Sequence, residues 1–276
     1  MNAHTTTVVD NDGARLHVER RGSGPALLMI SGGGGDAARY TAVARLLATT
    51  HTVLTYDRRG NAGSRPAAGS PAGDLMMGQQ SDDARAVIEA SGVAHACVFG
   101  NSGGAIIALD LAVRHPNLVD TLIAHEPPLI RALPDPGHYT TAYDHIERTL
   151  ARDGWRPAAM EFMTVNGMIP PNPIARTALR LALASTLGPA RDLAFFITHE
   201  MRSFIDYSPD LDAIAALPAP VHLAAGHASK DQYPYRASKA IAERAGRPFT
   251  EFPGGHAGFT QTSGAFATKL HELLPQ

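Results

Sequence analysis

The sequence predicts an α/β fold, a doubly wound and mostly parallel β-sheet with a helical cap inserted between two of its strands. Several apolar runs are short and continuous, which is typical of strands buried on both faces. These runs alternate with helical patterns along the chain. This alternation stops over residues 128–210, where prolines cluster and only helical patterns follow. The 276 residues, 44% hydrophobic and 18% charged, suffice for one large core.

The strands can be placed in chain order. Thr6–Val9 and Leu16–Val18 flank the turn Asn11-Asp12-Gly13, and we expect this β-hairpin to form an antiparallel edge of the sheet. The buried strands are predicted at residues 26–30, 52–56, 96–99, 119–124, 221–225 and 249–252.

Helical patterns fill the spaces between the strands. They cover residues 37–48, 82–90, 104–114 and 236–245. Ser81 is the predicted N-cap of the second helix, and Gly246 closes the last one. We therefore predict a core domain of residues 1–127 and 211–276, and a cap of residues 128–210. Most apolar side chains of the cap are expected to pack within it, and a few to face a cleft.

The net charge and the cysteine count limit the classes of binding partner and the cellular compartment that the sequence favours. A formal net charge of -2 provides no long-range field that recruits nucleic acid or an anionic membrane. The single cysteine, Cys97, lies inside a predicted strand, which excludes an internal disulfide and favours a reducing compartment. Neither a membrane span nor a signal-peptide pattern is present in the sequence. We expect a cytoplasmic protein whose binding partner is a small molecule. The sequence is also compatible with assembly into a homo-oligomer.

The main chemical signal is Gly100-Asn101-Ser102-Gly103-Gly104, a G-x-S-x-G motif between a predicted strand and a predicted helix. In that context the chain turns sharply, and the flanking glycines let strand and helix approach each other. The serine side chain then stands exposed above the sheet. Ser102 is therefore the predicted nucleophile.

His256 is the predicted general base. It lies in a glycine-rich loop after the last predicted strand, so its ring can reach over the sheet edge to Ser102. Two carboxylates compete to orient this ring. Glu126 follows the strand at 119–124, and Asp231 follows the strand at 221–225.

A glycine-rich run, Ser31-Gly32-Gly33-Gly34-Gly35, supplies predicted oxyanion donors. We expect the N–H groups of Gly33 and Gly103 to stabilise a developing negative charge. The same run allows a second interpretation, because Gly32, Gly34 and Ala37 satisfy G-x-G-x-x-A, with Asp57 as a ribose ligand. This dinucleotide-binding hypothesis leaves Ser102 without a role, so we do not favour it.

Two further motifs, His199-Glu200 and Arg58-Arg59, are expected to have structural roles rather than to bind a metal or a substrate. His199-Glu200 is half of the zinc motif H-E-x-x-H, but Ser203 stands in place of the second histidine, so we predict no metal site. Arg58 and Arg59 are expected to brace loops rather than to bind an acidic substrate. We predict no cofactor.

Together these motifs resemble the α/β-hydrolase fold family over nearly the whole chain. Tyr56-Asp57-Arg58-Arg59-Gly60 is similar to the Asp-x-Arg-Gly turn of the family, and Gly254-Gly255-His256 is similar to its histidine loop. The segment from Ser31 to Gly35 takes the place of its His-Gly oxyanion segment.

The predicted acid departs from the usual family pattern. Family members usually place an aspartate three residues after the glycine that ends the penultimate strand, where this chain has Ser229. In the haloalkane dehalogenase branch the acid can follow the preceding strand instead, at a position that His125-Glu126 resembles. The resemblance therefore favours Glu126 over Asp231.

The resemblance implies a cofactor-independent serine hydrolase that cleaves an ester, lactone or thioester through an acyl-enzyme. The methionine- and phenylalanine-rich cap favours a largely apolar small-molecule substrate. Dehalogenases and epoxide hydrolases of this fold carry aspartate as nucleophile, so Ser102 argues against both. Carbon–carbon bond cleavage, a non-hydrolytic reaction and a ligand-binding protein with a hydrolase pocket stay open as alternatives.

Overall fold

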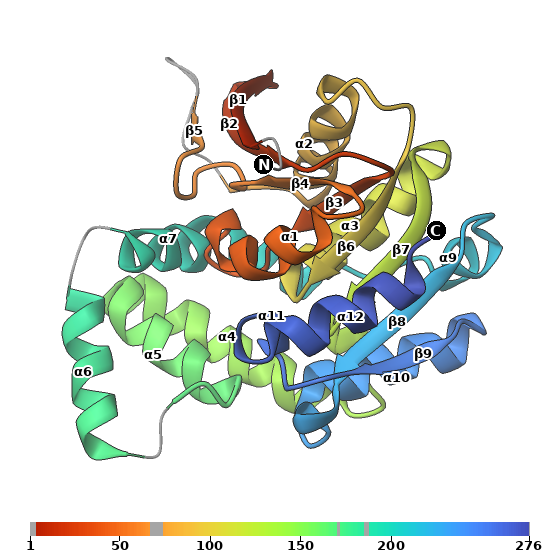
Figure 1. The fold of residues 1–276 in the computed structure, drawn as a ribbon. Coiled ribbons are helices and arrows are strands. Elements are labelled where there is room, and N and C mark those ends of the chain that lie inside the picture. The colour runs from red at the N-terminus through yellow and green to blue at the C-terminus, as the bar shows by residue number, and fades with distance from the viewer. Residues whose placement is uncertain (1–3, 67–73, 170–171, 185–187, 276) are drawn as a thin grey trace.

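The structure is a computed structural model that describes residues 4–66, 74–169, 172–184 and 188–275 (Figure 1). It confirms the predicted fold class, since strands and helices alternate and the strands join in one sheet. The strands are β1(His4–Asn11), β2(Ala14–Arg21), β3(Ala26–Ile30), β4(Thr52–Tyr56), β5(Arg65–Pro66), β6(Ala96–Asn101), β7(Val119–His125), β8(Val221–Gly226) and β9(Phe249–Phe252).

The sheet has the order β1-β2-β4-β3-β6-β7-β8-β9, with β5 paired to β2. The pairs β1–β2 and β2–β4 are antiparallel, which confirms the predicted hairpin at the edge. All pairs from β4 to β9 are parallel. The carboxyl ends of these parallel strands therefore share one edge, where loops from distant parts of the sequence meet.

Each face of the sheet has its own apolar core, because successive side chains of a strand point to opposite faces. The helices α1(Thr41–Leu47) and α12(Ser263–Leu273) pack on one face, against Met29 and Phe99 among others. The helices α2(Met77–Ala90), α3(Gly103–Arg114) and α10(Tyr233–Ala245) pack on the other (Figure 1). Burial on both faces explains why the central strands are continuous apolar runs.

The start of α2 corrects the sequence prediction. Ser81, the expected N-cap, lies inside this helix, which begins at Met77. The Ser81 hydroxyl donates to the carboxylate of Asp110 at 2.5 Å and accepts from the guanidinium of Arg114 at 2.6 Å, so side chains of α3 engage it in place of a backbone N–H at a helix start. The end of α10 agrees with the prediction, because Gly246 follows it in the left-handed conformation with φ 62°.

A helical insertion, defined here as the described residues between β7 and β8, occupies most of the predicted cap range. Figure 1 shows α4 to α7 gathered at one side of the sheet. Residues 170–171 and 185–187, including the predicted proline pair Pro170-Pro171, lie outside the described residues, and the domain division stays a prediction. The insertion contains η3(Ile130–Ala132), α4(Pro136–Asp153), α5(Trp155–Val165), α6(Pro173–Ala184), α7(Pro189–Phe195), the π-helical turn η4(Phe196–Glu200), α8(Met201–Asp206) and α9(Leu211–Ala216).

The turn between β6 and α3 brings backbones closer together than a side chain allows. A Cβ atom added at Gly104 would lie 2.1 Å from the carbonyl oxygen of Ile30. One added at Gly100 would lie 2.2 Å from the carbonyl oxygen of Gly104. Backbone atoms in a packed interior cannot move aside independently. These two glycines therefore determine how closely β6, α3 and β3 approach one another.

Replacing Gly104 with alanine is expected to lower the free energy of unfolding by about 1–3 kcal/mol, because the added methyl group overpacks a rigid site. Gly264→Ala is the matched control. A Cβ atom at Gly264, in the first turn of α12, meets nothing within 4 Å, so this change should stabilise the helix by up to about 1 kcal/mol. Urea unfolding followed by circular dichroism measures both, and equal effects would contradict the steric argument.

Candidate active site

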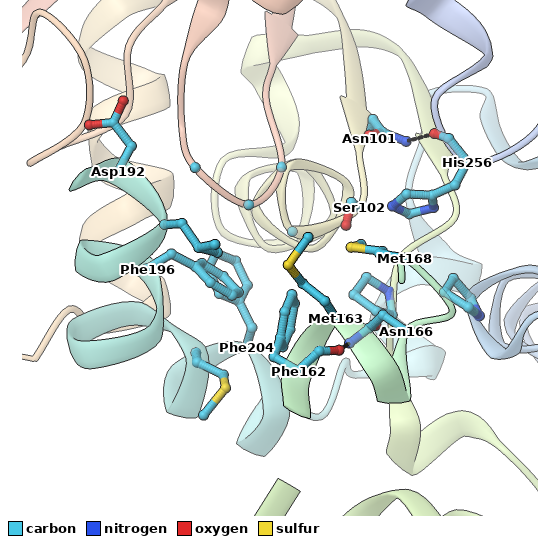
Figure 2. Close-up of a pocket in the computed structure, with 18 of the residues that line it drawn as sticks. Asn101, Ser102, Phe162, Met163, Asn166, Met168, Asp192, Phe196, Phe204 and His256 are labelled. Carbon is cyan, nitrogen blue, oxygen red and sulfur yellow. Dashed lines mark hydrogen bonds between the residues drawn. The ribbon is translucent and has the colours of Figure 1, made fainter. Parts of the chain in front are cut away.

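Ser102 stands at the tip of the turn between β6 and α3, in a backbone conformation that side chains rarely adopt. Its φ is 58° and its ψ is -127°, a region that costs about 1–3 kcal/mol for a residue other than glycine. Its N–H donates to the carbonyl oxygen of His125 at 2.9 Å, which joins the turn to the end of β7. The conformation points the serine side chain away from both elements and into a cavity (Figure 2).

His256 comes to Ser102 from the loop after β9. Figure 2 shows its ring pointing toward the Ser102 side chain. The Nδ1 atom on the other side of the ring lies 2.5 Å from Oε2 of Glu126. One ring nitrogen is therefore engaged by a carboxylate, and the second is directed at the serine. This is the arrangement that general-base catalysis requires.

Glu126 is wholly buried directly after β7, and both of its carboxylate oxygens have partners. Oε1 accepts the N–H of Gly226 at 2.8 Å, while Oε2 faces His256. Burial raises the pKa of Glu126, but the hydrogen bond and charge of His256, the nearby His125 and the Gly226 N–H together hold that pKa below its ordinary value. The carboxylate is therefore ionised at neutral pH and can hold the imidazole ring.

The structure places Asp231, the alternative acid, on the surface. It follows the short turn after β8, and the neighbouring Lys230 pairs with Glu251 at 3.0 Å, outside the cavity. Of the two candidate acids, only Glu126 is in contact with His256. The chain therefore brings together Ser102, His256 and Glu126 from three different loops at the carboxyl edge of the sheet.

Asn101 and His125 are two buried residues of this site that the sequence analysis missed. The Asn101 amide donates to the carbonyl oxygen of His256 at 3.1 Å and to Nδ1 of His125 at 3.0 Å. Burial lowers the pKa of His125 to about 4, despite the opposing charge of Glu126, so the ring is neutral and Nδ1 can accept. Asn101 thus links the loops that carry the serine, the histidine and the glutamate. Its position inside the G-x-S-x-G motif was the available signal.

The predicted oxyanion donors line the same cavity. Gly103 is the first residue of α3, where N–H groups have no acceptor within the helix. Arg58 donates to the carbonyl oxygen of Gly32 at 3.0 Å. In a trans peptide the carbonyl and the following N–H point in opposite directions, so this bond orients the N–H of Gly33 away from Arg58.

Arg58 is held in turn by Glu200, and neither side chain has exposed surface. The guanidinium donates to both carboxylate oxygens, at 2.5 and 3.1 Å, and Gln80 donates to the same carboxylate at 2.7 Å. This confirms the predicted bracing role of Arg58. Arg59 likewise forms two bonds to Asp83, at 2.9 and 2.7 Å. Because Glu200 lies on η4, the Arg58–Glu200 pair joins the helical insertion to the glycine-rich loop.

The cavity has a volume of about 460 Å³, and Ser102 and His256 line it. It lies between the carboxyl edge of the sheet and the helical insertion, with side chains from both (Figure 2). As expected, a few apolar residues of the insertion face it. Its apolar wall includes Phe162, Met163, Met168, Leu193, Phe196 and Phe204.

The geometry does not support the dinucleotide-binding hypothesis. Asp57, the proposed ribose ligand, is 6% exposed. Its two oxygens accept the N–H groups of Ala37 and Gly63, at 2.9 and 2.8 Å. The carboxylate therefore stabilises its own turn and has no free face for a ribose hydroxyl.

The residues that the structure describes offer neither a candidate metal site nor a membrane-spanning helix. Among them, no cluster of three or more histidine, cysteine, aspartate or glutamate side chains could hold a metal ion. No helix that the structure describes is both long enough and apolar enough to cross a membrane.

Comparison with known proteins agrees with the fold. Residues 25–256 match the protein-family model described as alpha/beta hydrolase fold, and the chain belongs to this family. An uncharacterized hydrolase, YraK of Bacillus subtilis (strain 168), is 33% identical over 95% of this chain and 93% of its own length.

Two solved structures show the same fold. An alpha/beta hydrolase from Sphaerobacter thermophilus DSM 20745 has a TM-score of 0.71 and 23% identity, covering 98% of this chain and 99% of its own. The enol-lactonase from Burkholderia xenovorans LB400 has a TM-score of 0.68 and 18% identity, covering 99% of this chain and 100% of its own. The family and the relative from Bacillus subtilis mark the chain as a hydrolase.

The lowered pKa of Glu126 predicts a pH dependence of stability. The unfolded chain takes up the Glu126 proton at a higher pH than the folded protein does, so this contribution to stability is complete above the ordinary pKa and is lost as the pH falls. In urea unfolding from about pH 6 to about pH 3.5, the wild type should therefore lose more free energy of unfolding than Glu126→Gln. Asp231→Asn, on the exposed alternative acid, should follow the wild type, and a Glu126→Gln profile parallel to the wild type would contradict the prediction.

Proposed function

We propose that the protein is a cofactor-independent serine hydrolase that cleaves an ester, lactone or thioester of a small, largely apolar molecule. The observation that carries this proposal is the pair of buried Glu126 and part-buried His256, which is aimed at Ser102 on its strained turn. A structural role alone gives no reason to hold a serine in an unfavourable conformation at the wall of a cavity.

The chemistry follows from the geometry. Ser102 Oγ attacks the substrate carbonyl while Nε2 of His256 takes its proton, and Glu126 holds the resulting imidazolium. The N–H groups of Gly33 and Gly103 bind the oxyanion of the tetrahedral intermediate. This intermediate collapses to the acyl-enzyme as His256 returns the proton to the leaving alcohol or thiol. Water, deprotonated by His256, then attacks the acyl carbonyl and releases the acid and Ser102.

The cavity supports the proposed substrate class. Its walls beyond the catalytic groups are formed largely by methionine, phenylalanine and other apolar side chains, which favour the burial of an apolar substrate body. Methionine and phenylalanine side chains adapt to different shapes, which suits an acyl or alcohol portion of modest size.

A fluorophosphonate probe should form a covalent adduct at Ser102, because the activated hydroxyl attacks the phosphorus centre as it attacks a carbonyl. Intact-protein mass spectrometry followed by peptide mapping detects the adduct. Ser102→Ala should remain unlabelled, while Ser203→Ala, which removes another partly buried serine, should label like the wild type. A wild type that stays unlabelled would instead indicate a ligand-binding protein with an inactive hydrolase pocket.

Glu126→Gln should lower kcat for p-nitrophenyl butyrate by about 10³- to 10⁴-fold, since a neutral amide neither holds the required tautomer nor stabilises the imidazolium. Asp231→Asn is the matched control and should stay within about twofold of the wild type. Steady-state kinetics at pH 7 measures both. The assignment of the acid fails if the Asp231 variant shows the larger loss.

A further inference from the structure

One group of polar side chains interrupts the apolar wall of the cavity. Tyr143 on α4, Asn166 directly after α5 and Tyr233 at the start of α10 all line it, and we call them the tyrosine–asparagine cluster. The two tyrosines are only 2% and 3% exposed. The serine mechanism uses none of the three residues.

The cluster is closed by its own hydrogen bonds. The two tyrosine hydroxyls lie 2.9 Å apart. The Tyr233 hydroxyl donates to Oδ1 of Asn166 at 2.9 Å. The Asn166 amide donates to the Tyr143 hydroxyl at 3.0 Å and to the carbonyl oxygen of Phe162 at 2.7 Å. Burial raises the pKa of both tyrosines, so the hydroxyls keep their protons at neutral pH.

A count of donors and acceptors shows what the cluster can still bind. The amide of Asn166 uses both hydrogens, Tyr233 donates to Asn166, and Tyr143 donates to Tyr233. All four hydrogens are then used. Each of the three oxygens accepts one bond and keeps capacity for one more. The remaining capacity is therefore for accepting hydrogen bonds, not for donating them.

We propose that the tyrosine–asparagine cluster is a substrate-binding subsite that accepts a hydrogen bond from a neutral hydroxyl or amide N–H group. This inference rests on the proposed function and adds a specificity rule to it. A carboxylate at this position finds no free donor, because any hydrogen offered to it must first break a bond of the cluster. An ammonium group would lose its hydration among apolar walls without a carboxylate partner in the cluster.

The position of the cluster relative to Ser102 predicts how the substrate is arranged along the cavity. In the view of Figure 2, the side chain of Met168 lies between Ser102 and Asn166, and Met163 lies beside it toward Phe162. A substrate that reaches both ends therefore has a reactive carbonyl at Ser102, an apolar spacer along the methionines and a hydrogen-bond donor at its far end.

The test uses pairs of substrates that differ only in the donor hydrogen. For the acyl side, p-nitrophenyl esters of ω-acetamido acids are compared with their N-methyl counterparts. For the alcohol side, butyrate monoesters of diols are compared with their methyl ethers. Spacers of about four to eight carbons in each series cover different reaches within the cavity. Wild-type kcat/KM should favour the donor-bearing member by about tenfold at one spacer length.

The variants separate recognition from structure. Tyr143→Phe, Asn166→Leu and Tyr233→Phe combined remove all three acceptor oxygens and should reduce this preference to about twofold or less, whereas Tyr233→Phe alone removes one of them and should reduce it only in part; turnover of the methylated substrates stays within about threefold in both variants. In the single variant the Tyr143 hydroxyl can turn to Oδ1 of Asn166, 3.3 Å away, so the fold keeps a closed cluster. Tyr139→Phe is the control, since the Tyr139 ring packs against Tyr233 but is outside the cluster and the cavity lining.

The outcomes distinguish this inference from the proposed function. If no ester is turned over and Ser102 is not labelled, the proposed function fails and the subsite fails with it. If the methylated esters are turned over but the wild type shows no preference for a donor in either series, only the subsite is wrong. A preference that survives undiminished in the triple variant, which lacks all three acceptor oxygens, overturns it as well.

Discussion

The steric constraint at the turn around Ser102 governs the rest of the site. Gly100 and Gly104 allow β6, α3 and β3 to approach within distances that exclude any Cβ atom. Gly32 continues this fit, since a Cβ atom there would lie 2.7 Å from Cβ of Ser102. The surrounding backbone thus holds the serine in its unfavourable conformation, at a cost of about 1–3 kcal/mol that the packed core offsets. A larger residue at any of these glycines would move Ser102 relative to His256 and Glu126.

A polar network extends from the same turn to the loops that carry His256 and Glu126. Asn101 binds the backbone of His256 and the ring of His125, and His125 directly precedes Glu126. The network is consistent electrostatically, because His125 is neutral while Glu126 is charged. A neutral neighbour leaves the carboxylate of Glu126 as the acceptor that His256 requires. The positions of the serine, the histidine and the acid are therefore coupled rather than independent.

The helical insertion is tied to this arrangement through a buried ion pair. Removing one partner of such a pair leaves an uncompensated charge and costs about 3–5 kcal/mol, whereas the intact pair adds little net stability over an apolar substitute. The role of the Arg58–Glu200 pair is therefore to fix the positions of the groups that it contacts. Glu200 holds Arg58, Arg58 holds the carbonyl of Gly32, and that peptide carries the predicted oxyanion donor. Glu200, Arg58 and Gly32 thus couple the helical insertion to the glycine-rich loop beside Ser102.

Much of the fold could be predicted from sequence, because the signals are local. Apolar runs placed the strands from 26–30 to 249–252, and the spacing of Gly100, Ser102 and Gly104 indicated the nucleophile turn. Ser81 shows where local signals fail. Its sequence context suits a helix start, but α2 begins earlier, at Met77. The Ser81 hydroxyl instead donates a hydrogen bond to Asp110 on α3.

By itself, the sequence determined the order of elements, the reactive motif and a pair of candidate acids. Only the tertiary structure decided that Glu126 rather than Asp231 contacts His256, that Asn101 connects three loops and that Tyr143, Asn166 and Tyr233 form one cluster. The physical reason is that strand and turn preferences act over a few residues. Hydrogen bonds between residues 67 to 155 positions apart depend instead on how the whole chain packs.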